Sequence, residues 1–159
     1  MQKGIATLEI IIGTLIIALL LSVAIPNVTK ILDSVSLDYE TKRLYSELRF
    51  LQAMNRSKSS YKVAVGTGRT FDIDKACTMT INKNKFSYQI LRGNIPVRDV
   101  HYMQNIKELT FSSNKITSNS NGQATDTSGK VLSNTLTLTS KLGKKSSIVF
   151  DSVGRIRGG

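Results

Sequence analysis

The side chains from which enzymes usually build active sites are scarce in this 159-residue chain. Cys77 is the only cysteine, so no intrachain disulfide can form, and its alternating apolar surroundings are typical of a small core residue. His101 is the only histidine, and nothing in the sequence places it beside Cys77 as a base. No His, Cys, Asp or Glu cluster has metal-ligand spacing, and no nucleophile, base and orienting group form a set. The sequence therefore predicts a protein that is not an enzyme and uses no metal, cofactor or small-molecule substrate.

Acidic residues are also few, since 11 Asp and Glu stand against 22 Lys and Arg, for a net charge of +11. A small domain this basic is expected to meet an acidic partner such as nucleic acid, lipid head groups or an acidic protein. Solubility alone would explain the excess equally well. The charge balance therefore indicates a class of partners without choosing among them.

Charge is absent altogether from residues 10–29, which lie between Glu9 and Lys30. Residues 10–25 are almost wholly apolar, and a helix that spans a membrane needs roughly 20 apolar residues. The sequence therefore predicts a transmembrane helix over residues 5–26.

Gly4 precedes this apolar run, whereas the cleavage site of an ordinary secretory signal follows its apolar run. Cleavage between Gly4 and Ile5 would remove a leader of residues 1–4 and leave the helix on the mature chain. Lys3 marks the cytoplasmic end of the helix by the positive-inside rule. We therefore expect a single-pass protein of the cytoplasmic membrane whose globular domain lies outside the cytoplasm.

Glu9 is the one acidic residue beside the apolar run. A carboxylate at the edge of a membrane helix is costly, which makes such residues functional candidates. Cleavage after Gly4 would create an amine on Ile5, one helical turn from Glu9. Glu9 is therefore a candidate assembly residue, whose charge would pair with that amine on a neighbouring subunit and fix the axial stagger between helices. The alternative is that Glu9 simply reaches the membrane interface.

These landmarks together resemble the N-terminus of the type IV prepilin family. Counting from Ile5, Glu9 is fifth and Pro26 is twenty-second, as is usual in that family. The sequence departs from the family in having Ile5 where phenylalanine is usual and Ala6 where threonine is commoner. The resemblance implies cleavage by a prepilin peptidase, N-methylation of the new terminus, and other pilin subunits as partners.

Apolar residues continue at helical spacing beyond Pro26, which is expected to kink or locally melt the helix. The spacing predicts an amphipathic helix over residues 27–60 that packs on the globular domain. The step from Tyr39 to Leu44 is five residues, so the stripe slips there or the helix bends. We expect the upstream half to lie among other subunits and the downstream half to pack on the domain. The stripe consists of Val28, Ile31, Leu32, Val35, Tyr39, Leu44, Leu48, Leu51 and Met54.

From residue 61 the pattern changes to short alternating segments, separated by clusters of Gly, Asn, Lys and Ser. Many short strands with turn signals predict an antiparallel sheet or a small sandwich. The expected fold class is α+β, with a long N-terminal transmembrane helix that continues into a β-rich pilin domain over residues 61–159. Residues 112–130 are expected to form a mobile polar loop. The candidate strands are residues 61–65, 77–81, 86–91, 97–103, 108–111, 135–139 and 147–150.

The last two of these strands are expected to form a hairpin around Gly143. Its turn would carry Lys141, Lys144 and Lys145 close together. These three lysines are candidate DNA-binding residues, because their charges suit a phosphate backbone.

The C-terminal tail carries Arg155 and Arg157 on either side of Ile156. In an extended chain both arginines point one way, about 7 Å apart, while Ile156 faces inward. That spacing approximates neighbouring phosphates on one nucleic-acid strand, and the preceding Gly154 lets the backbone approach closely. The tail is similar to the glycine-arginine-any-arginine ending of DNA-binding members of the GspH/FimT group of minor pilins. The resemblance implies non-specific binding of double-stranded DNA for natural transformation.

Three functions stay open at this point. The first is a DNA-binding minor pilin of a competence pilus, which the basic excess and the arginine tail favour. The second is a structural minor pseudopilin that primes a type II secretion system and binds no DNA. The third is a major pilin that builds the filament shaft. If the chain binds no DNA, the tail is a solvated basic segment or an assembly contact.

Overall fold

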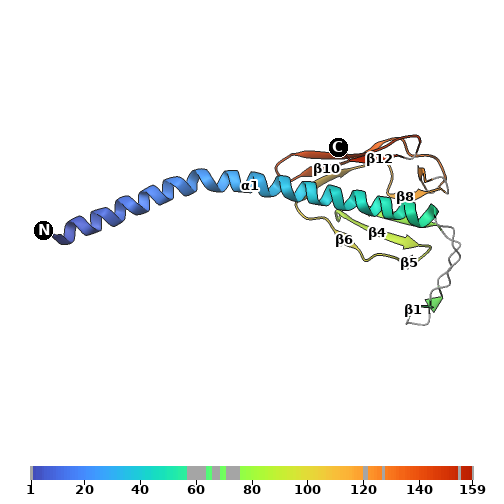
Figure 1. Cartoon of the computed structure of the whole chain (residues 1–159), viewed down its shortest axis with the longest axis horizontal. Helices are drawn as coiled ribbons and strands as arrows, with labels where there is room; N and C mark the ends of the chain where they lie inside the picture. The colour runs from blue at the N-terminus through green and yellow to red at the C-terminus, as the bar shows by residue number, and fades with distance from the viewer. Residues whose placement is uncertain are drawn as a thin grey trace.

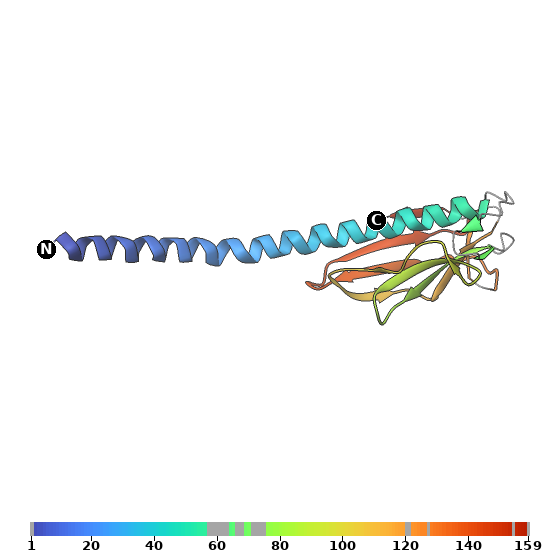
Figure 2. The same cartoon turned by 90° about the horizontal axis from the view of Figure 1, so that it is seen from below.

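The computed structural model describes residues 2–56, 64–65, 69–70, 76–119, 122–126, 128–153 and 155–158, with the backbone alone for residues 2–7, 64–65 and 69–70. One long N-terminal helix is followed by antiparallel β-sheets, so the expected α+β layout is confirmed. The N-terminal half of the helix extends away from the rest of the chain, and its C-terminal half lies along the sheets (Figure 1). Most of the β-strands lie to one side of the helix (Figure 2).

Helix α1 runs without interruption from Gln2 to Arg56. Pro26 lies inside it, so of the two expected alternatives, a kink or local melting, the melting is wrong. Proline removes one backbone donor, but the helical hydrogen bonds on either side keep α1 continuous, and its axis changes direction between the N-terminal half and the half along the sheets (Figure 1). Residues 57–60, where the sequence predicts the end of the helix, lie outside the described residues.

Two sheets build the β domain, and all their strand pairs are antiparallel. One sheet has the strand order β12-β11-β10-β7, and the other has the order β5-β4-β3-β8-β9, with β6 also paired to β4. Strands β1 (Ala64–Val65) and β2 (Arg69–Thr70) pair separately. The remaining strands are β3 (Cys77–Asn82), β4 (Ser87–Arg92), β5 (Ile95–Pro96), β6 (His101–Tyr102), β7 (Ile106–Thr110), β8 (Lys115–Ser118), β9 (Ala124–Thr125), β10 (Thr135–Ser140), β11 (Lys145–Phe150) and β12 (Ile156–Gly158).

Two sequence expectations about the strands are wrong. Residues 97–103 do not form one strand, because β5 and β6 pair with opposite ends of β4 and the chain bends between them. Residues 112–130 are not a continuous loop, since they contain β8 and β9. Ile116 of β8 is fully buried opposite Met79, although the residues around it are polar.

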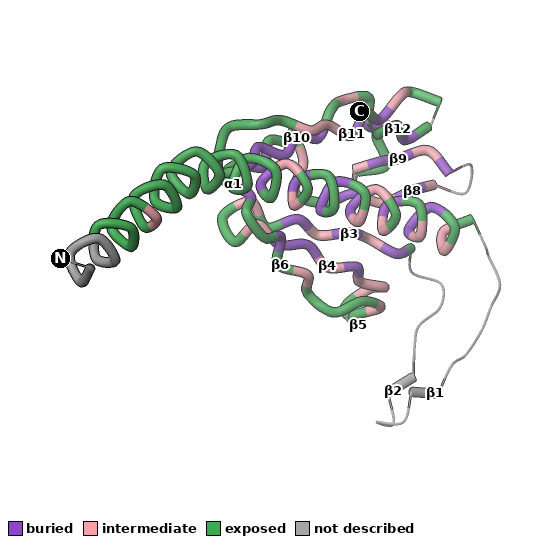
Figure 3. The backbone as a smooth tube through the Cα atoms, turned by 60° about the vertical axis from the view of Figure 1, so that its left-hand side comes forward, coloured by how far each residue is buried: buried purple, intermediate pink, exposed green. Residues whose placement is uncertain are grey.

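One apolar core lies between α1 and the inner faces of the two sheets (Figure 3). The helix contributes Leu44, Leu48 and Leu51, each at most 1% exposed. Cys77 is fully buried in this core, as its apolar surroundings predict. Burying one such leucine stabilises the fold by about 1.5–3 kcal/mol. From the sheets come Met79, Ile90, Ile116, Leu136, Leu138 and Ile148, all fully buried.

Candidate functional site

The N-terminal half of α1 is apolar and uncovered in the isolated chain. The most apolar 18-residue window of the helix has a mean hydropathy of 2.7, and none of it is buried. By length and composition α1 is able to span a membrane. Gly4 and Ile5 lie in its first turn, and the exposed Glu9 follows one turn later. The predicted cleavage-site residues and Glu9 therefore share one continuous helix.

In residues 28–39 of α1, one face is buried against the β domain and the opposite face is exposed to solvent. On one face Asp33 and Leu37 are buried against the β domain, at 7% and 5% exposed. The other face carries an apolar stripe whose side chains are 52–61% exposed. We call this set the outer stripe, and it consists of Val28, Ile31, Leu32, Val35 and Tyr39.

The apolar stripe slips between Tyr39 and Leu44, as one of the two sequence alternatives predicts. Tyr39 is 57% exposed whereas Leu44 is fully buried, and α1 is continuous between them. Each residue of a helix is rotated by about 100° from the one before it. Leu44, five residues after Tyr39, therefore points about 140° away from Tyr39 around the helix axis. The slip therefore turns the apolar face from solvent toward the domain without a break in the helix.

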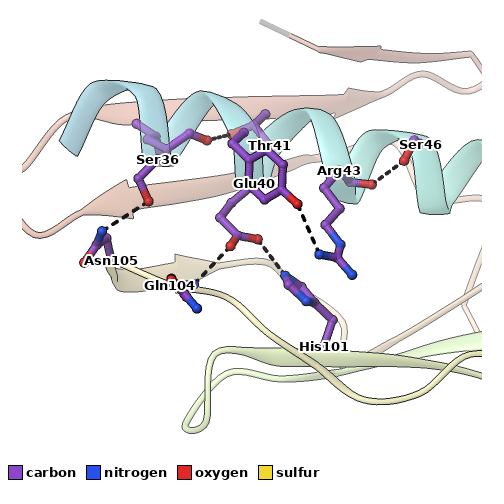
Figure 4. Close-up of polar contacts among 10 residues, drawn as sticks. Ser36, Glu40, Thr41, Arg43, Ser46, His101, Gln104 and Asn105 are labelled. Carbon is purple, nitrogen blue, oxygen red and sulfur yellow. Dashed lines mark hydrogen bonds and ion pairs between the residues drawn. The ribbon is translucent and has the colours of Figure 1, made fainter. Parts of the chain in front are cut away.

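A buried carboxylate docks the middle of α1 on the domain (Figure 4). Glu40 is 2% exposed, and its Oε2 lies 2.8 Å from Nε2 of His101. Its Oε1 accepts a hydrogen bond from the backbone N–H of Gln104 at 3.1 Å. Both carboxylate oxygens are thus bonded, which is what a buried charge requires.

Further polar contacts flank Glu40 along the same side of α1. Toward the N-terminus, Ser140 Oγ donates to Asp33 Oδ2 at 2.5 Å. Toward the C-terminus, Asn55 bonds both backbone groups of Cys77, accepting from its N–H at 2.7 Å and donating to its carbonyl at 2.9 Å. These contacts fix the position of the helix on the domain, and sequence reasoning missed all of them.

Tyr88 packs beside this polar contact, with its ring centroid 5.2 Å from that of His101. Burial raises the pKa of the Tyr88 phenol well above its ordinary value. The guanidinium of Arg43 partly opposes this pKa shift, while the carboxylates of Glu47 and Glu40 add to it. The phenol therefore stays protonated throughout the physiological pH range.

The C-terminal tail is an edge strand of the first sheet. In β12, Ile156 is 3% exposed, while Arg157 is exposed opposite Val149 of β11. The expected inward direction of Ile156 is therefore confirmed. Arg155 is also exposed, but its Nε lies 3.3 Å from Asp151 Oδ2. The carboxylate of Asp151 thus neutralises part of the charge of Arg155, which sequence reasoning did not anticipate.

The β10–β11 hairpin turns at Gly143, as expected, and Lys141, Lys144 and Lys145 are exposed there. Gly143 has a φ of +86°, which residues with a Cβ rarely adopt. The structure does not bring these lysines together with both arginines. Arg157 lies roughly 14 Å along β11 from Lys145, on the same face of the sheet, and Arg155 lies roughly 20 Å away. Gly154 lies outside the described residues.

Comparison of the chain with protein families, with characterised proteins and with solved structures finds no match. Among the described residues, no group of three His, Cys, Asp or Glu side chains is arranged to hold a metal ion. The functional interpretation therefore rests on the geometry of the chain and on the resemblance of its two ends to pilins.

Proposed function

We propose that this chain is a minor pilin, anchored in the cytoplasmic membrane by residues 5–26 and assembled into a type IV pilus or pseudopilus. The observation that carries the proposal is the outer stripe of α1. The opposite face of the same segment docks on the β domain. In the proposed topology, with residues 5–26 in the membrane, this segment lies beyond the bilayer together with the domain. Lipid therefore does not cover the stripe, and exposed apolar surface of this kind is typical of a protein contact. Helices of neighbouring subunits supply that contact.

In the proposed filament, Glu9 pairs with the amine of Ile5 on a neighbouring subunit after cleavage by a prepilin peptidase. Glu9 is exposed on the uncovered half of α1, so nothing in its own chain competes for the carboxylate within the described residues. A carboxylate among apolar helices requires a cationic partner. The pair therefore sets the axial stagger at which helices meet.

The test of this proposal is Glu9→Ala, with Glu9→Asp as the charge-conserving variant. We expect Glu9→Ala to remain in the membrane fraction at wild-type abundance and to be lost from sheared filaments. Glu9→Asp should retain part of the assembly, because it keeps the charge with a shorter reach. Assembly of Glu9→Ala at the wild-type level would rule out the pairing role.

The basic outer face of the first sheet supports a second activity, non-specific binding of double-stranded DNA. Lys145 and Arg157 lie roughly 14 Å apart on one face, and the major groove of B-DNA is about 12 Å wide. The two basic groups are thus suitably spaced for the two phosphate strands that border the groove. Arginine suits phosphate because its planar group donates two hydrogen bonds at once.

The DNA activity is tested by gel-shift of the purified chain with duplexes of different sequence at several salt concentrations. A plot of the logarithm of the binding constant against the logarithm of the salt concentration should be linear. With about 3 to 5 phosphate contacts, its slope should be roughly −3 to −4.5. Arg155→Gln with Arg157→Gln should weaken binding to every sequence alike and flatten the slope by up to about 2. Asp151→Asn should strengthen binding, because it removes the carboxylate beside Arg155.

The matched control is Lys85→Gln with Lys115→Gln, which removes two exposed charges from the other sheet. We expect this control to bind nearly as the wild type does. Loss of binding in the control with retention in the arginine variant would place the site on the other sheet. Absence of binding by the wild type at low salt would leave the structural pseudopilin of a type II secretion system as the function.

A further inference from the structure

The second sheet has a hollow on its outer face that neither assembly nor DNA binding uses. Its volume is about 250 Å³, and it lies over β3, β4 and β6. Most of the strand residues that line it alternate with the buried Met79, Ile81 and Ile90, so it opens on the side of the sheet opposite the core. Tyr88 of β4 also borders the hollow but is itself buried in the core. A hollow of this size is smaller than the usual pocket for a drug-sized ligand and fits a single ring.

Strand register places polar groups of the hollow in two rows. Asn82, Ser87 and Tyr102 lie side by side across β3, β4 and β6. Thr80 and Gln89 form the next row. With strands about 4.8 Å apart, three neighbouring side chains span roughly 10 Å. The polar groups are thus close enough to contact one small ring together.

An exposed aromatic ring stands beside these polar groups. Tyr102 is 58% exposed and Val100 is 43% exposed, while Ser87 in the floor is only 4% exposed. The hydroxyls of Thr80 and Ser87 and the side-chain amide of Gln89 offer both donors and acceptors. A sugar ring has C–H groups on its faces and hydroxyls around its rim. An aromatic wall over a floor of neutral donors and acceptors matches that pattern.

We propose that this hollow binds one sugar ring of a glycan, stacked on Tyr102 and hydrogen-bonded to Asn82, Thr80 and Gln89. Lys85 is the charged residue in its lining, and Lys115 lies opposite Thr80 on β8. Because both side chains are cationic, a sugar that carries a carboxylate binds more tightly than its neutral counterpart. A single-stranded nucleic acid is disfavoured, because such sites track the phosphate backbone with a basic groove, whereas most of this lining is neutral.

The test is an NMR titration of the full chain with glucose, N-acetylglucosamine and glucuronate, and with oligothymidylate as a separate arm. The detergent is a phosphocholine, because maltoside detergents carry a sugar themselves. We expect the sugars to shift the side-chain amides of Asn82 and Gln89 and the ring of Tyr102. A site for one ring should have a Kd of about 1 mM, with glucuronate the tightest of the three.

Tyr102→Ala should weaken the sugar affinity by about tenfold, because it removes the stacking surface. Tyr102→Phe should retain the affinity, and so should Tyr39→Ala, which removes an equally exposed tyrosine from α1. The proposal is overturned if no sugar shifts these signals, or if the shifts persist unchanged in Tyr102→Ala. Shifts with oligothymidylate alone would also overturn it and would make the hollow a nucleic-acid platform. None of these outcomes bears on pilus assembly, which is tested separately through Glu9.

Discussion

The two halves of α1 carry apolar side chains at the same helical spacing but meet different surroundings. Leu44 is fully buried in the core of the chain, whereas Leu20 is 67% exposed. The β domain spans only the C-terminal half of the helix, so it covers the inner face there and leaves the outer stripe open (Figure 3). The comparison shows that one half of the helix is used by the fold and the other is available to other molecules.

The polar residues of the docked and uncovered halves of α1 also differ in their surroundings. In the docked half, Glu40 and Asn55 find their partners within the chain. In the uncovered half, Glu9 is exposed and lies at the edge of an apolar segment. In the proposed filament, the partner of Glu9 is the amine of Ile5 on a neighbouring subunit. The contrast separates polar groups that the fold itself satisfies from one that the proposed assembly would use.

The largest effect is expected when a core leucine of α1 and a leucine of the outer stripe are each replaced by alanine. Leu44→Ala should lower the free energy of unfolding by about 2–5 kcal/mol, because it leaves a cavity in the core. Leu32→Ala should change that free energy by no more than about 0.5 kcal/mol, yet it should reduce incorporation into sheared filaments. Urea unfolding and filament yield measure the two effects. Equal destabilisation by both variants would remove the distinction between the covered face of α1 and its outer stripe.

A smaller effect is expected from the buried carboxylate in the docked half. Glu40→Ala should destabilise the chain by about 1–3 kcal/mol, since His101 and the N–H of Gln104 lose their acceptor. The control is Asp38→Ala, which breaks an exposed pair with Lys42 and should cost at most about 1 kcal/mol. In a double-mutant cycle with His101→Ala, the losses should be non-additive. Additive losses would show that Glu40 and His101 do not act as a pair.

The smallest effect is expected far from α1, in the turn held by Asp126. Its carboxylate accepts hydrogen bonds from Ser128 and from the backbone of Lys130, and the bond from the Ser128 side chain is the main cause of its lowered pKa. A lowered folded-state pKa adds stability above the unfolded value of about 4, and this stability is lost as the pH falls through the folded value.

Asp126→Ala should therefore differ from the wild type in urea unfolding at about pH 6, and the difference should shrink at about pH 3. An equal difference at both pH values would mean that the charge of Asp126 plays no part. Because the hydrogen bonds that Asp126 accepts all come from its own turn, filament yield should not change. The result would show how much of the pH dependence of the unfolding free energy arises from this turn.

Features set by local periodicity were predictable from the sequence. The two helical segments follow from their apolar spacing, although their continuity through Pro26 was not expected. The five-residue step from Tyr39 to Leu44 indicated either a change of face or a bend, and the structure shows the change of face. The inward direction of Ile156 followed from alternation in an extended strand. Each of these depends only on residues that are neighbours in the chain.

Features that depend on distant contacts were not predictable. Glu40 and His101 are 61 residues apart, and no pattern in the sequence connects them. Strand β8 was missed because Ile116 is the only large apolar residue among its four, and β9 because it is only two residues long. The pairing of Arg155 with Asp151 was also missed, although its four-residue spacing in a short turn was a usable signal.

The most direct test of the account is the mass of the native protein isolated from its cells. The uncovered half of α1 is proposed to remain on the mature chain as the membrane and assembly helix, so the mature chain should begin at Ile5. A methyl group on that new amine would add to the mass and agree with the resemblance to pilins. A mature chain that begins after residue 22 or later would mean that the apolar segment is an ordinary secretory signal. That result would contradict both the anchor and the assembly role proposed for α1.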